Sequence, residues 1–89
     1  MKMKVETVEV PDEGLFALMG KRVTLMCSNY FYLGTLVGVN DTCVKLDSPS
    51  IVYETGAFTD TKYKDAQALP NSIYVQISHI EAFGIIKEQ

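Results

Sequence analysis

The chain has 89 residues, which is the size of one domain with a small hydrophobic core. Its net charge is −3, with 8 basic against 11 acidic residues, and this balance excludes the strongly basic surface typical of proteins that bind nucleic acid through its phosphates. We find no apolar run of roughly 18 residues that could span a membrane and no secretory leader pattern in MKMKVETVEV, so we expect a cytoplasmic protein without membrane contact.

The first segments predict an arm and a helix. Residues 1–11 alternate charged side chains and valines, which is typical of an ordered arm or a short edge strand. Residues 12–19 predict a helix with Asp12 at its N-cap and Gly20 placed to end it. Its apolar residues have the i, i+3, i+4 spacing of one helix face: Leu15, Leu18 and Met19. A helix of about two turns is unstable alone and must pack on an apolar surface.

From residue 22 the apolar period changes to two, which predicts three strands over 22–53. Residues 54–71 have no clean period and predict a variable loop that could contain a small hairpin extension around Tyr63. Two further strands are expected over 72–86. The fold class is therefore mainly β, with a short N-terminal α-helix followed by a strongly bent, five-stranded antiparallel small barrel of the SH3-like or OB-like kind.

Two glycines lie inside the second strand. Gly34 and Gly38 coincide with a break in the apolar alternation, because Tyr32 and Leu36 are in phase whereas Val39 is not. Glycine weakens a strand unless the chain must bend or another backbone must approach closely. We therefore expect a bulge and a sharp bend that allow the sheet to curl into a barrel, with Gly20, Gly34 and Gly38 as fold-determining residues.

The last two strands carry apolar residues on both faces. An exposed edge of this kind would aggregate unless it paired with the edge of another chain. We expect the following residues at a contact between copies: Ile73, Tyr74, Val75, Ile77, Ile80, Phe83 and Ile85. A head-to-tail contact of this type closes into a ring when the rotation between copies divides the circle.

The residues that carry chemistry are sparse. The chain has 1 histidine and 2 cysteines, and Cys27 and Cys43 are far apart in sequence, so no metal-ligand spacing is present. Its carboxylates are scattered, and no nucleophile lies beside a base. We expect no enzyme activity, no metal and no cofactor. Both cysteines are expected to be reduced and structural, with a bridge or a reactive thiol as the alternative.

The stretch MGKRVTLMCSNYFYLGTLVGVNDTCVKL resembles the first motif of the Sm and Sm-like (LSm) proteins, a family that includes bacterial Hfq. The matching positions are Leu18, Gly20, Val23, Leu25, Tyr32, Gly34, Leu36, Val39 and Asn40. IYVQISHIEAFG resembles the second motif through Val75, Ile80 and Phe83. The resemblance covers residues 12–86, and the short loops and acidic balance favour a divergent bacterial or viral member.

The resemblance implies a homo-oligomeric ring of about five to seven subunits, in which the fourth strand of one copy pairs with the fifth strand of the next. It also implies that single-stranded RNA binds at the pore, through the loops after the second and fourth strands. The residues that it places there are Asn40, Asp41, Cys43, Gln76, Ser78 and His79. Gln76 and Ile77 stand where the family has an Arg-Gly pair, so the alternative is a ring-shaped scaffold that binds a protein partner and has lost the RNA site.

Several candidate residues also have a purely structural interpretation. Asn40 and Asp41 suit a tight turn for their own sake, and Gln76 is either an interface hydrogen-bonder or a weak reader of bases. Residues 30–32 (Tyr-Phe-Tyr) form either a stacking platform or part of the core and interface. The basic pair at 21–22 either contacts phosphates or only follows the helix C-terminus, where cations are favourable.

Overall fold

The computed structural model describes residues 13–87. In chain order its elements are the 3₁₀-helix η1 (Leu15–Leu18), β1 (Arg22–Cys27), β2 (Phe31–Val39), β3 (Cys43–Glu54), β4 (Asp65–Ala68), β5 (Ile73–Gln76), the 3₁₀-helix η2 (Ile77–His79) and β6 (Ile80–Gly84). All strand pairs are antiparallel in one sheet of order β4-β3-β2-β1-β6, and β5 pairs with β3. The prediction of a mainly β, antiparallel domain is confirmed. The predicted number of five strands is wrong, because the sheet formed by residues 13–87 has 6 strands, and over these residues it is not closed into a barrel.

The predicted α-helix over 12–19 is wrong in type and length. The structure has a four-residue 3₁₀-helix, Leu15–Leu18, that follows Gly14 without a side-chain cap. The expected N-cap, Asp12, lies outside the described residues, as does the predicted arm over 1–11. Leu15 and Leu18 still pack on the core, as the spacing predicts. The helix ends there because Met19 is already extended, with a ψ of 131°, and Gly20 donates its N–H to Leu36 O on the neighbouring strand at 2.7 Å.

The irregularity predicted in β2 is present as two shifts of its register against β3, of which the first has its extra residue on β3 and the second on β2. The β2–β3 register shifts between Leu33 and Thr35, and again between Leu36 and Gly38. At the second shift Val37 is the extra residue on β2, which explains the break in apolar alternation. The backbone approach at Gly34 is close, since a Cβ built there would lie 2.8 Å from Leu46 Cβ. At Gly38 the same construction meets only Lys45 Cβ, at an ordinary 3.5 Å.

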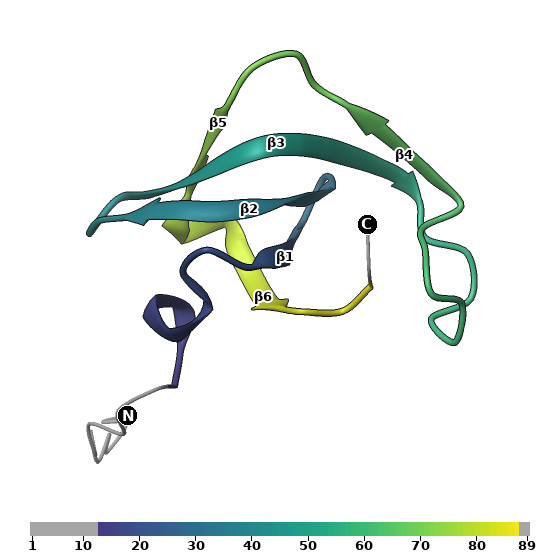
Figure 1. Cartoon of the computed structure of the whole chain (residues 1–89), viewed down its shortest axis with the longest axis horizontal. Helices are drawn as coiled ribbons and strands as arrows, with labels where there is room; N and C mark the ends of the chain where they lie inside the picture. The colour runs from purple at the N-terminus through teal and green to yellow at the C-terminus, as the bar shows by residue number, and fades with distance from the viewer. Residues whose placement is uncertain (1–12, 88–89) are drawn as a thin grey trace.

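The long strand β3 organises the rest of the sheet (Figure 1). Its first half pairs with β5 and its second half pairs with β4, so the two short strands lie at opposite ends of one arc. The change of partner occurs around Ser48, which has a φ of +46°. Residues 54–71, predicted as a loop, therefore contain β4. They also bring Tyr63 into the interior, where its hydroxyl lies 2.8 Å from that of buried Thr24.

The core has two clusters on opposite faces of the curled sheet, because Leu33 is the ladder partner of Thr24, whose side chain points away from those of its strand neighbours Val23 and Leu25. Its main cluster consists of Val23, Leu25, Cys27, Leu36, Val44, Leu46 and Val75, and a smaller cluster consists of Leu33, Val52 and Tyr63. Both cysteines are free, and burial, followed by the charge of Glu81, raises the pKa of the Cys27 thiol. Within residues 13–87, no helix is long and apolar enough to cross a membrane.

Candidate functional site

The turn between β2 and β3 is built around the side chain of Asn40. Its Oδ1 accepts hydrogen bonds from Thr42 N (2.8 Å), Thr42 Oγ1 (3.1 Å) and Cys43 N (2.8 Å). Its backbone N–H also donates to Cys43 O at 3.0 Å. This is the self-contained turn that asparagine favours, so the structural interpretation of Asn40 accounts for its carbonyl oxygen. The Nδ2 group takes no part in these bonds and can still donate to a ligand.

A groove of about 650 Å³ lies beside this turn. It collects four of the six predicted RNA-site residues: Asp41, Cys43, Gln76 and Ser78. They meet because Cys43 and Gln76 are partners in the β3–β5 ladder and because Ile77 N donates to Thr42 O at 2.9 Å. Tyr74 also lines the groove, which the sequence did not predict. We call this the rim groove. Asn40 and His79 are not among its lining residues.

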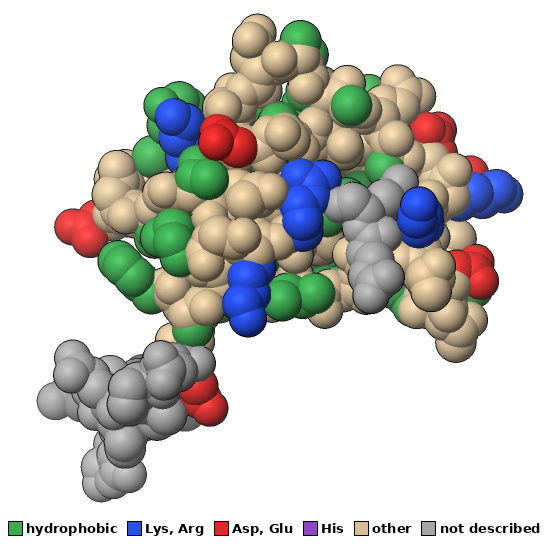
Figure 2. Space-filling model, in the orientation of Figure 1, with side chains coloured by type: hydrophobic (Ala, Val, Ile, Leu, Met, Phe, Trp, Pro, Cys, Tyr) green, Lys and Arg blue, Asp and Glu red, His purple; other side chains and the backbone are tan. Residues whose placement is uncertain are grey.

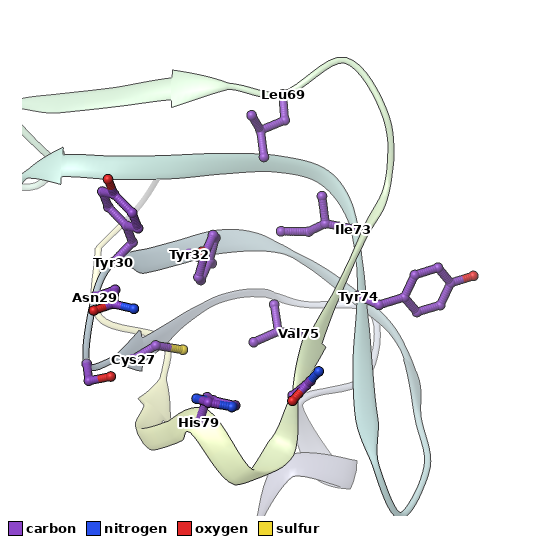
Figure 3. A pocket seen from close by; sticks show the side chains of 11 residues that line it. Cys27, Asn29, Tyr30, Tyr32, Leu69, Ile73, Tyr74, Val75 and His79 are labelled. Atoms are coloured by element: carbon purple, nitrogen blue, oxygen red, sulfur yellow. The ribbon is translucent and has the colours of Figure 1, made fainter.

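A second cavity, of about 320 Å³, opens on the other side of β5 (Figure 3). It lies between the free edge of β5, the β1–β2 turn and η2, where the sheet fails to close. Ile73 and Val75 point into it toward Tyr32 and Cys27, whereas Tyr74 points away (Figure 3). We call it the edge cavity. His79 lines it, together with the polar β1–β2 turn.

The sequence marked many of the edge-cavity residues without predicting that they meet. Tyr30 and Tyr32 were candidates for stacking or packing, and Tyr30 forms an edge-to-face pair with Tyr53 at a centroid distance of 5.7 Å. The period-two spacing of Ile73 and Val75 was the available signal, because it places both on one face of a strand. The contact of this face with the β1–β2 turn depends on the curl of the whole sheet, which no local pattern specifies.

Of the predicted contact residues, Val75 is buried in the subunit's own core and Ile73, Ile77 and Ile80 pack against it, which corrects their assignment to a contact between copies. The remaining three are exposed near the free edges of β5 and β6. Phe83 is the ladder partner of Leu25, so the two side chains share one face of the sheet. Leu25 is completely buried on that face, whereas Phe83 is 42% exposed. Tyr74 on β5 and Ile85 beyond β6 are also exposed. Among residues 13–87, neither β6 nor β5 has a strand on its second edge.

Most basic groups of the described chain have intramolecular partners. The guanidinium of Arg22 donates to Ser48 O at 2.8 Å, Lys64 pairs with Glu54 at 3.2 Å, and Lys45 lies over the ring of Tyr74 at 5.8 Å. Lys87 is buried. On the face shown in Figure 2, lysine and arginine side chains are scattered and form no continuous patch. The Arg22 side chain therefore braces the β3 bend, a structural role that differs from the predicted one of a cation placed after a helix C-terminus.

No family model matches this chain, and no curated protein matches it in sequence.

Proposed function

We propose that this protein is an Sm-like, homo-oligomeric ring protein whose copies join by pairing β5 of one subunit with β6 of the next. The observation that carries the proposal is the exposure of Phe83 at the free edge of β6. An aromatic side chain on the core face of a sheet is normally covered, yet Phe83 remains 42% exposed because the sheet ends beside it. A strand added at this edge would cover it.

The two free edges differ in sequence and position, which determines the symmetry of the contact. Pairing β5 with β6 of another copy leaves one unused edge at each end of the pair, so further copies can add in the same way. Such a head-to-tail contact forms a ring when it closes. The edge cavity lies along β5, where the added strand would place its side chains. Resemblance to the Sm-like proteins supports a ring of about five to seven subunits.

Gln76 allows this contact to be tested without disturbing the fold. Ile77 donates its N–H toward the β3 side, to Thr42 O, and adjacent residues of a strand direct their N–H groups to opposite edges. The N–H of Gln76 therefore points to the free edge. Its φ of −71° and ψ of 128° are also compatible with proline. Gln76→Pro removes this donor and adds a ring at the edge, while Gln76→Ala removes only the side chain.

Light scattering on the two variants is the experiment. We expect Gln76→Ala to keep the oligomeric mass of the wild type and Gln76→Pro to shift toward the 9.9 kDa monomer with an unchanged far-ultraviolet circular dichroism spectrum. Full assembly of a folded Gln76→Pro protein would contradict pairing at the β5 edge.

Binding of single-stranded RNA at the rim groove is a second candidate function. It is favoured by one observation: Asp41, Cys43, Gln76 and Ser78 come together next to an exposed aromatic ring, Tyr74. Exposed rings stack on bases, and amide and hydroxyl groups read base edges, so this groove suits a base more than a phosphate.

Fluorescence anisotropy with A-rich and U-rich oligonucleotides tests this candidate at low salt. Tyr74→Ala is the informative variant, because it removes the exposed ring of the rim groove that would stack on a base and changes no charge. We expect weaker binding by Tyr74→Ala and by Gln76→Ala. Absence of binding by the wild-type protein would remove the RNA function and leave the ring as a scaffold for a protein partner.

A further inference from the structure

Lys87 is an unusually buried lysine. Its residue is only 3% exposed, and its Nζ donates to Thr55 O at 2.6 Å, Ala57 O at 2.7 Å and Lys62 O at 3.3 Å. Buried lysines are generally paired with a carboxylate. Within residues 13–87, the partners found for this ammonium group are instead neutral backbone carbonyls and aromatic rings.

The surroundings of Nζ match the chemistry of a primary ammonium group. An –NH₃⁺ group has three donors and no acceptor, and three carbonyl oxygens receive them here. The rings of Tyr63 and Phe58 lie 4.9 and 5.4 Å from Nζ, close enough for cation–π attraction. We call residues 55–63 the ammonium cage.

The ammonium cage has its own supports, which do not involve Lys87. Ala57 O also accepts from Asp60 N at 3.0 Å, and Thr55 O accepts from Lys64 N at 3.4 Å. Gly56 has a φ of +67°, a conformation that side chains rarely adopt, and an added Cβ would lie 3.2 Å from Lys64 Cβ. Tyr63 is fixed through its hydroxyl contact with Thr24. These bonds orient two of the carbonyl groups and the Tyr63 ring independently of the Lys87 side chain.

We propose that the ammonium cage is a binding site for a primary alkylammonium ion, and that Lys87 is its ligand from the same chain. Binding of the Lys87 side chain holds residues 85–87 in place. These residues follow β6 and run toward the loop between β3 and β4 (Figure 1). The cage selects a singly charged primary amine, because its acceptors are neutral carbonyls that receive N–H donors. A quaternary ammonium has no N–H to donate.

Chemical rescue of Lys87→Ala tests the site. The substitution removes three methylene groups and the amine, so n-propylammonium is the matching probe. We expect saturable binding of n-propylammonium chloride to Lys87→Ala, seen as NMR shifts confined to residues 55–63 and as a rise in its unfolding temperature. The wild type, with its cage filled, should respond to n-propylammonium no more than to sodium chloride. 1-Propanol and tetramethylammonium chloride should rescue neither protein.

Equal responses of the wild type and Lys87→Ala to n-propylammonium would overturn the proposal, as would rescue by 1-propanol. Lys62→Ala is the matched control, because it keeps the backbone carbonyl and removes an exposed side chain. It should behave as the wild type.

Two further variants keep the test decisive if Lys87→Ala does not fold. Lys87→Met retains an apolar chain of similar length without the charge, and Phe58→Ala removes a ring that is 58% exposed and therefore opens no core cavity. We expect faster amide hydrogen exchange over residues 55–63 and at Lys87 or its substitute in both variants. Exchange rates equal to the wild type in Lys87→Met would show that the cage does not bind the ammonium group.

Discussion

The close approach of β2 to β3 at Gly34 can be tested with one added methyl group. In Gly34→Ala the new Cβ would lie 2.8 Å from Leu46 Cβ, 3.3 Å from Leu46 Cδ1 and 3.2 Å from Asp47 O. Leu46 is completely buried and Asp47 O belongs to the backbone, so neither can move away without displacing the sheet. Overpacking of this kind costs about 1–3 kcal/mol. In a domain of this size each kcal/mol corresponds to about 4–8 °C, so we expect an unfolding temperature lower by roughly 5–20 °C.

Thermal unfolding followed by circular dichroism measures this loss, and Gly38→Ala is the matched control. That residue lies on the same strand, but its Cβ would meet only Lys45 Cβ at 3.5 Å. We expect Gly38→Ala to change the free energy of unfolding by no more than about 0.5 kcal/mol. The interpretation is refuted if Gly34→Ala unfolds within a few degrees of the wild type, or if both variants lose the same stability.

Three further predictions concern the interior and the bend of β3. Tyr63→Phe leaves the buried Thr24 hydroxyl without its 2.8 Å partner, so urea denaturation should show a loss of about 1–3 kcal/mol, part of which the double variant Thr24→Val/Tyr63→Phe should restore. Burial raises the pKa of Tyr63, an effect partly offset by its bond to Thr24, so the folded state holds the phenolic proton more tightly than the unfolded chain. The free energy of unfolding should therefore fall as the pH rises above about 10. If the Tyr63→Phe variant shows the same fall at alkaline pH, groups other than Tyr63 cause it. Ser48→Gly should raise the free energy of unfolding by up to about 1 kcal/mol, because Ser48 is exposed and has a φ of +46°; a loss of stability would contradict this.

The irregularity of β2 could be predicted from sequence because its causes are local. Two glycines and a break in the apolar alternation fall within a few residues, and the structure has register shifts beside both. The predicted helix over 12–19 is longer than the observed Leu15–Leu18. Apolar spacing indicates which residues face the core, but it does not give the residue at which the helix ends. The strand β4 was missed because Asp65–Ala68, DAQA, has little intrinsic β-propensity and pairs only because the second half of β3 offers an edge.

The candidate site could be predicted only in part. The resemblance placed Asp41, Cys43, Gln76 and Ser78 together, and the structure brings these residues to one groove. The ammonium cage gave no local signal, because Lys87 is 25 or more residues from the carbonyls that it contacts. A single lysine near charged neighbours resembles an ordinary surface residue in sequence, and only the path of the chain after β6 brings it into the interior.

Pairing between the β5 and β6 edges is most directly tested by the native mass of the wild-type protein, measured by native mass spectrometry across a range of concentrations. We expect one dominant species at a fixed multiple of 9.9 kDa, about five- to sevenfold. A single 9.9 kDa species at every concentration would contradict the proposal, because Phe83 would then remain uncovered in solution.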